Sequence, residues 1–128
     1  MTISTPLVNH VDFVTIFVDD FEKAVEFYGT VLGLEPGPRY GQIDGREFET
    51  GNLTLSVMRA GAIGLEFERS GHPIALQVDD VAAAREQLEA QGVEFQGDVI
   101  DSGVCHMAPF RDPAGNALML HHRYAPRD

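Results

Sequence analysis

The sequence of 128 residues contains one cysteine, Cys105, and no tryptophan. A single thiol cannot form a disulfide within the chain, which excludes the small secreted domains that disulfides hold together and favours a reducing compartment. The first residues, Met1–Pro6, lack the basic start and the apolar run of a signal peptide, so we expect no export. The sequence therefore predicts a cytoplasmic protein.

Positive charge and long apolar runs are also scarce. Lys and Arg number 9 against 20 Asp and Glu, which gives a net charge of −11 at pH 7. Such a charge repels phosphate backbones and anionic lipids, so nucleic-acid and membrane partners are not expected. The apolar stretches fall well below the roughly 20 residues of a membrane-spanning helix. With 44% hydrophobic and 23% charged residues, the chain is expected to form one globular domain over residues 1–128.

A repeat divides the chain into two halves of similar plan. Val18-Asp19-Asp20-Phe21 recurs as Val78-Asp79-Asp80-Val81, and Gly33-Leu34-Glu35 recurs as Gly92-Val93-Glu94. Such self-similarity indicates two supersecondary units of one design. We assign them to about residues 8–68 and 72–124.

Each half begins with a strand that leads into a helix. Runs rich in β-branched and apolar residues predict strands at Val11–Val18 and Ile74–Val78. Apolar residues at helical spacing predict helices over Phe21–Leu32 and Val81–Leu88. An Asp stands at the start of each helix, so we assign these carboxylates to capping and not to catalysis.

Further strands follow each helix. They are predicted at Glu47–Thr50, Leu53–Met58, Val93–Val99, Val104–Phe110 and Ala117–His122. Turns are predicted where Gly, Pro, Ser and Asn cluster, at Pro36–Pro38, Gly61–Gly64, Ser70–Gly71 and Asp112–Asn116. The last of these turns is expected to join two strands as a structural hairpin.

Two segments carry a resemblance to a known family. The string VDDFEKAVEFYGTVLGLEP, residues 18–36, is similar to the first strand-to-helix segment of the vicinal oxygen chelate superfamily, which contains glyoxalase I, extradiol dioxygenases, fosfomycin-resistance enzymes and bleomycin-resistance proteins. The string FRDPAGNALMLHH, residues 110–122, resembles the closing hairpin of that superfamily. The resemblance implies an α+β fold of two βαβββ modules, whose curled mixed sheets form an open barrel-like cavity with the helices outside.

The resemblance also implies where the metal-dependent members of the superfamily hold a divalent ion. The corresponding positions in this chain are Phe13, Pro73 and Met119, and a fourth within Leu53–Met58, where neither His nor an acidic residue occurs. A phenyl ring, a proline ring and a thioether are unsuitable ligands for hard divalent ions. No cofactor is therefore expected.

A displaced metal site or acid–base chemistry is the alternative. His72 and His121 lie close to two of these positions, and His106 lies in the strand before His121. These imidazoles could hold a divalent metal if a bulge turned His72 inward, or His106 and His121 could act as catalytic acid and base. Cys105 adjoins His106 on one strand and must point to the other face, so we expect Cys105 to pack against a helix.

Strand alternation gives the candidate ligand-binding residues, because every second side chain of a strand faces the same side. The predicted lining of the sheet cavity is Phe13, Thr15, Phe17, Gln77, Met119 and His121. Apolar walls with a few polar groups are typical of small-molecule pockets. The favoured interpretation is a metal-free binder of a mainly apolar or aromatic small molecule. The alternatives are a lyase, isomerase or dioxygenase of the same fold, and a subunit whose apolar face serves assembly.

We also expect a homodimer. Two curled half-sheets in a short chain leave apolar edges exposed, and the resemblance is to proteins that pair modules across a two-fold axis. Whether the two modules pair within one chain or across the dimer, and which ligand binds, stays open at this level.

Overall fold

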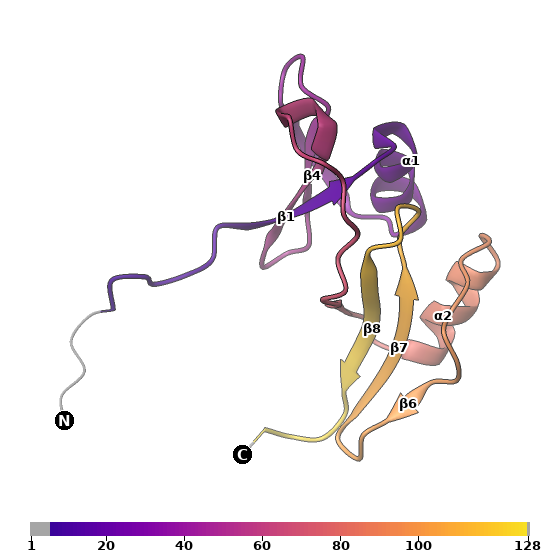
Figure 1. The fold of residues 1–128 in the computed structure, drawn as a ribbon. Helices are drawn as coiled ribbons and strands as arrows, with labels where there is room; N and C mark the ends of the chain where they lie inside the picture. Colours follow the sequence, from indigo (N-terminus) through magenta and orange to yellow (C-terminus); the bar gives the residue numbers. More distant parts are fainter. Residues whose placement is uncertain (1–5, 128) are drawn as a thin grey trace.

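The computed structural model describes residues 6–127 of the chain. Met1–Thr5, on which most of the prediction about a signal peptide rests, lie outside these residues. The described part forms two units, each with one four-stranded mixed sheet, and neither sheet closes into a barrel (Figure 1). Residues 6–127 contain no helix that is long and apolar enough to cross a membrane. The predicted α+β class is confirmed.

The sequence repeat becomes a repeat of topology. The first unit contains β1 (Phe13–Val18), α1 (Phe21–Glu26), the π-helix η1 (Phe27–Val31), β2 (Glu35–Arg39), β3 (Gly45–Glu49), β4 (Thr54–Arg59) and the 3-10 helix η2 (Ala60–Ile63). The second contains β5 (Ile74–Gln77), α2 (Val81–Glu89), β6 (Ile100–Asp101), β7 (Cys105–Arg111) and β8 (Ala117–Arg123). The strand orders are β1-β4-β3-β2 and β5-β8-β7-β6. In both sheets the first strand runs parallel to the last.

The two α-helices begin as the sequence predicts. The Asp20 carboxylate accepts a hydrogen bond from the backbone N–H of Lys23 at 3.1 Å, and Asp80 accepts one from Ala83 at 2.9 Å. Each bond satisfies a donor that has no partner inside the helix. The second Asp of each pair is therefore the N-cap.

Two segments differ from the predicted secondary structure. The turn predicted at Pro36–Pro38 is wrong, because Glu35–Arg39 forms β2, an edge strand with a register shift. An edge strand tolerates proline, since one row of its backbone groups needs no partner. The strand predicted at Val93–Val99 is reduced to one bridge between Phe95 and Phe110, and continuous pairing begins only at β6.

One apolar core spans both units, and the aromatic rings of η1 join its two halves. The Tyr28 ring lies 6.1 Å from that of Phe48 on β3. The neighbouring Phe27 ring lies 6.4 Å from that of Phe110 on β7. Burial of aromatic side chains contributes strongly to core stability, so η1 fixes the two sheets relative to each other.

A buried polar junction holds the β7–β8 hairpin against the first unit. The Asp112 carboxylate accepts hydrogen bonds from the Tyr28 hydroxyl at 2.7 Å, from the backbone of Asn116 at 2.8 Å and from the backbone of Ala114 at 3.0 Å. The Asn116 side chain donates to the Phe17 carbonyl at 2.8 Å. Burial and the Asp112 carboxylate raise the pKa of Tyr28, so the phenol stays protonated and donates. The predicted structural hairpin is confirmed.

Candidate functional site

Each sheet has a core face and a second face directed away from the core, which we call the open face. On β1, Ile16 and Val18 are buried in the core. Phe13, Thr15 and Phe17 alternate with them and therefore share the open face. Phe13 is 56% exposed, and the other two are half-buried. The three binding residues predicted in the first unit thus lie together.

The other three predicted binding residues share the open face of the second sheet. Gln77 of β5 pairs with His121 of β8, and Met119 lies two residues earlier on the same face of β8. The six residues therefore form two groups on separate sheets. That one cavity contains both groups stays a prediction.

The two histidines predicted as acid and base lie on opposite faces of the second sheet. Ala108 and Phe110 of β7 are buried in the core. Because every second side chain of a strand points to the same face, His106 also lies on the core face. His121 lies on the open face. Cys105 shares the open face, so the expectation that it packs against a helix is wrong.

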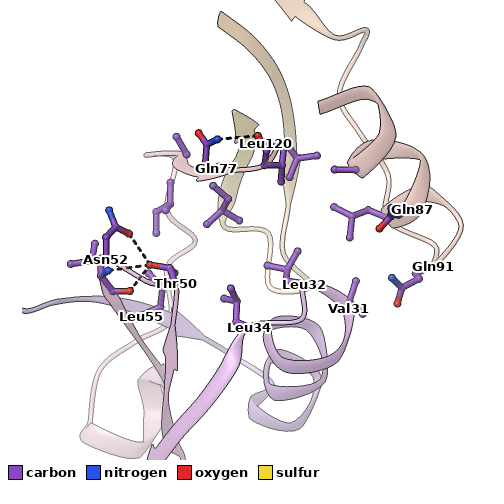
Figure 2. A pocket seen from close by; sticks show the side chains of 17 residues that line it. Val31, Leu32, Leu34, Thr50, Asn52, Leu55, Gln77, Gln87, Gln91 and Leu120 are labelled. Atoms are coloured by element: carbon purple, nitrogen blue, oxygen red, sulfur yellow. Dashed lines mark hydrogen bonds between the residues drawn. The ribbon is translucent and has the colours of Figure 1, made fainter. Parts of the chain in front are cut away.

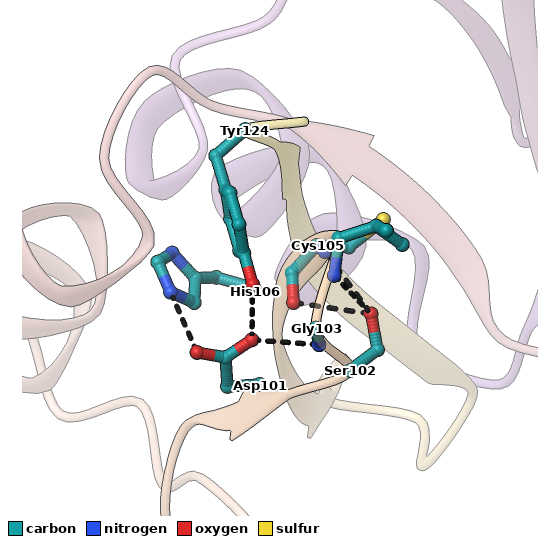
Figure 3. A network of polar contacts seen from close by, with 7 residues as sticks. Asp101, Ser102, Gly103, Cys105, His106 and Tyr124 are labelled. Atoms are coloured by element: carbon teal, nitrogen blue, oxygen red, sulfur yellow. Dashed lines mark hydrogen bonds and ion pairs between the residues drawn. The ribbon is translucent and has the colours of Figure 1, made fainter. Parts of the chain in front are cut away.

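His106 belongs to a polar network beside the turn between β6 and β7 (Figure 3). Its Nε2 atom lies 3.5 Å from the Asp101 carboxylate, which also accepts hydrogen bonds from the Gly103 N–H at 2.9 Å and the Tyr124 hydroxyl at 2.8 Å. The bond from Gly103, followed by that from Tyr124, lowers the pKa of Asp101. The same carboxylate raises the pKa of Tyr124. The network closes the turn and ties β8 to β6.

The open face of the first sheet carries a polar cluster that sequence reasoning missed. The Tyr40 hydroxyl donates to Glu47 Oε2 at 3.0 Å and lies 2.9 Å from Ser56 Oγ. Because the single phenol proton goes to Glu47, the Ser56 hydroxyl donates to the Tyr40 oxygen. Ser56 pairs with Glu47 on one side and with Thr15 on the other. The cluster therefore adjoins a predicted binding residue.

Tyr40 reaches this cluster because position 45 is glycine. A Cβ atom at Gly45 would overlap the Tyr40 ring, so only glycine lets the ring approach β3 so closely. The ring packs beside Ser56, which is 2% exposed. Burial is the main cause that raises the pKa of Tyr40; the bond to Glu47 raises it further and the bond to Ser56 lowers it. The phenol therefore remains a donor at neutral pH.

The side chains at the metal positions do not fit a divalent ion. The strand pairing identifies the fourth metal position, which the sequence places only within Leu53–Met58. Thr15 and Ala75 are equivalent in the two repeats; Ala75 pairs with Met119, and Thr15 pairs with Ser56. Ser56 therefore occupies the fourth position. The four positions hold Phe13, Ser56, Pro73 and Met119, without one imidazole or carboxylate. Within residues 6–127, no three His, Cys, Asp or Glu side chains are grouped to hold an ion, and this includes the displaced set around His72 and His121.

A cavity of about 390 Å³ lies between the two units (Figure 2). Its walls come from the end of η1, the turn between β3 and β4, and the elements β5, α2 and β8. Of the six predicted binding residues, only Gln77 lines it. The alternation of apolar residues did not predict this cavity, because it assigns side chains to the faces of one strand and does not show which distant elements lie next to each other.

Comparison with known proteins identifies the family. The sequence model of the Glyoxalase/Bleomycin resistance protein/Dioxygenase superfamily matches residues 8–120. No curated protein matches the sequence.

Three solved structures illustrate the similarity of fold. A glyoxalase/bleomycin resistance protein/dioxygenase from Nocardioides is 21% identical, with a TM-score of 0.72, and the match covers 99% of this chain and 93% of that one. The antibiotic-binding protein TnmS3 from Streptomyces sp. CB03234 is 24% identical, with a TM-score of 0.75 and coverage of 93% and 99%. A lactoylglutathione lyase from Agrobacterium tumefaciens is 19% identical, with a TM-score of 0.72 and coverage of 91% and 95%. The family model matches most of this chain, and the topology is repeated in its two units. The chain therefore belongs to the Glyoxalase/Bleomycin resistance protein/Dioxygenase superfamily.

Proposed function

We propose that this protein binds a mainly apolar or aromatic small molecule in a cavity formed by the open sheet faces, without a metal ion. The observation that carries the proposal is the hydrogen-bonded cluster of Tyr40, Glu47 and Ser56 on an open face that also presents Phe13 and Phe17. In small-molecule pockets, apolar walls supply buried area and a few polar groups fix the orientation of the ligand. The single cysteine suits a cytoplasmic binder.

The polar cluster indicates which ligand chemistry fits. Tyr40 donates to Oε2 of Glu47 and leaves Oε1 to accept another hydrogen bond. Glu47 takes part in none of the salt bridges of the described residues. A ligand hydroxyl, amide N–H or amine fits this position, whereas a ligand carboxylate would meet a like charge. We therefore infer an aromatic or apolar ligand that carries a hydrogen-bond donor.

We also propose that two copies of the chain form a homodimer that combines the open faces. Residues 6–12, before β1, extend away from the body of the molecule and carry three exposed apolar side chains (Figure 1). Leu7 is 100% exposed, Val8 76% and Val11 63%. Exposed apolar surface of this kind favours a partner surface. Light scattering should give 2 × 14.0 = 28 kDa, and a mass near 14.0 kDa at micromolar concentration would contradict the dimer.

The alternative function is catalysis by a lyase, isomerase or dioxygenase of the same fold. His121 favours it, because this imidazole lies on the open face and could exchange a proton with a bound molecule. His106 lies on the other face and cannot assist at the same ligand atom. Turnover of a bound molecule by the wild-type protein, lost in His121→Ala, would establish this alternative.

Thermal-shift screening of aromatic metabolites and antibiotics tests the binding proposal, because a ligand at about 100 times its Kd adds roughly 2.7 kcal/mol of stability. Each hit is then titrated into Phe17→Ala and Glu47→Gln. Loss of a hydrogen bond to a charged group is worth about tenfold in affinity, so Glu47→Gln should weaken binding by about that factor. Glu86→Gln, the same substitution as Glu47→Gln at an exposed position of α2 and away from both sheets' open faces, serves as the matched control. An absence of hits, or equal losses in all three variants, would contradict the proposal.

A further inference from the structure

The cavity between the two units is lined mainly by core-side residues, and of the open-face residues only Ala75 and Gln77, on the edge strand β5, border it. We infer that it is a second ligand site, and that it takes an uncharged, mainly apolar molecule with carbonyl or amide groups. This site is distinct from the one in the proposed function, because its walls and the polar cluster around Tyr40 have no residue in common; Gln77 alone belongs both to the cavity and to the predicted open-face binding residues.

The floor of the cavity is continuous with the apolar core. Leu55 and Leu120 are 1% and 2% exposed, and Leu88 of α2 is 7% exposed. Leu32 and Leu34 form the wall on the side of the first unit (Figure 2). The volume of about 390 Å³ is sufficient for a small organic ligand, since such pockets measure about 300–1,000 Å³. Filling it would bury apolar surface that now contacts water.

The lining carries no charge. All 17 side chains that form it are apolar, hydroxyl or amide groups, although 23% of the residues of the chain are charged. A carboxylate or phosphate would find no cation here, and an ammonium group would find no anion. Burial of an unpaired charge is costly, so the cavity selects against ions of either sign.

Amide side chains border the cavity on opposite sides. Gln87 of α2 and Gln91, just after its end, lie across from Asn52 (Figure 2). The Thr50 hydroxyl donates its single proton to the Leu53 carbonyl at 2.6 Å and lies 3.1 Å from Asn52 Oδ1, while the Asn52 NH₂ group has no hydrogen-bond partner within residues 6–127 and can donate to a ligand. The side-chain amides of Gln87 and Gln91 make no hydrogen bond with other lining residues (Figure 2). Each therefore offers one donor group and one acceptor to a ligand.

The edge of β5 adds backbone groups to the same cavity. The Val78 N–H donates to the His121 carbonyl at 3.0 Å, so the backbone groups of Val78 and Leu76 point toward β8. Those of Ala75 and Gln77 alternate with them and point to the unpaired edge. Ala75 and Gln77 both line the cavity. Carbonyl and amide groups of a ligand can therefore pair with backbone as well as with side chains.

Nile red, an uncharged apolar dye with a carbonyl group, is the probe for this site. We expect it to bind one per chain with an increase in fluorescence. Ala84→Glu places a carboxylate in the lining and should weaken binding by at least about tenfold, because an apolar site does not tolerate an unpaired charge. Ala83→Glu is the matched control, since Ala83 is exposed on the same helix and does not line the cavity. It should leave the affinity unchanged.

A double variant, Gln87→Ala with Gln91→Ala, removes two amides from exposed positions and so does not endanger folding. It should weaken dye binding by about three- to tenfold, the value of one or two neutral hydrogen bonds. Dye affinity unchanged by Ala84→Glu and by the double variant would overturn the inference. Affinity lost instead in Phe17→Ala would place the dye on the open face, which overturns this second site and leaves the proposed function intact.

Discussion

Removal of the hydrogen bond between Tyr28 and Asp112 should destabilise the whole domain, because this bond joins the two units. Its oxygen atoms lie 2.7 Å apart, although the residues are 84 positions apart in the sequence. Tyr28 is 0% exposed and Asp112 is 4% exposed. Tyr28→Phe deletes only the hydroxyl and keeps the ring packed against Phe27 and Phe48. The substitution therefore isolates the polar contribution.

The expected loss follows from the remaining partners of Asp112. A hydrogen bond to a charged group contributes about 1.5–3 kcal/mol. In Tyr28→Phe the carboxylate keeps the backbone donors of Ala114 and Asn116 and the Asn116 side chain, so the loss should be about 2 kcal/mol. Asp112→Ala removes the acceptor from all these donors, and from the phenol. It should cost about 3–5 kcal/mol, as breaking a buried charged network does.

Urea denaturation of Tyr28→Phe, Asp112→Asn and the double variant measures this junction. We expect a coupling energy of at least about 1 kcal/mol between the two sites, with an unchanged dependence on urea concentration. A loss below about 0.5 kcal/mol in Tyr28→Phe, or strictly additive losses, would refute the reasoning, because surface substitutions already reach that size.

Three further predictions concern the turns and the metal. Gly115→Val should lower the free energy of unfolding by more than about 1 kcal/mol, because the φ of Gly115 is +92°; equal stability in urea would contradict this. Tyr124→Phe should raise the pKa of Asp101 in an NMR titration. A lowered pKa of Asp101 stabilises the fold above the ordinary pKa of about 4, and this stabilisation is lost as the pH falls through the pKa of the folded state. The variant should therefore lose less stability in acid than the wild type. An unshifted pKa of Asp101 would argue against the network. Elemental analysis of the purified protein should give clearly less than one Zn, Ni, Mn or Fe per chain, whereas stoichiometric metal that disappears in His72→Ala or His121→Ala would support the displaced site.

Features determined by a few neighbouring residues could be predicted from the sequence. Asp20 and Asp80 cap the helices that follow them, and the hairpin after Asp112 forms through bonds to its own backbone. Glu35–Arg39 was missed because its prolines indicate a turn unless the strand lies at a sheet edge. Edge position is a property of the whole sheet, which local composition does not contain.

The candidate site was harder to predict, because its contacts depend on register. The hydrogen bonds of Tyr40 require that Glu47 and Ser56 stand opposite each other and that position 45 lacks a side chain. The faces of Cys105 and His106 depend on which neighbours fill the core. A shift of one residue moves every side chain of a strand to the other face of the sheet. Without the strand pairing, the apolar alternation of the sequence therefore did not determine which face His106 occupies.

Binding of a small molecule to the open faces should not require a metal ion. Isothermal titration of the strongest thermal-shift hit into EDTA-treated protein, before and after addition of zinc, measures this requirement. We expect binding to the EDTA-treated protein with a Kd that zinc does not change. Binding that appears only after zinc is added, and is lost in His121→Ala, would contradict it.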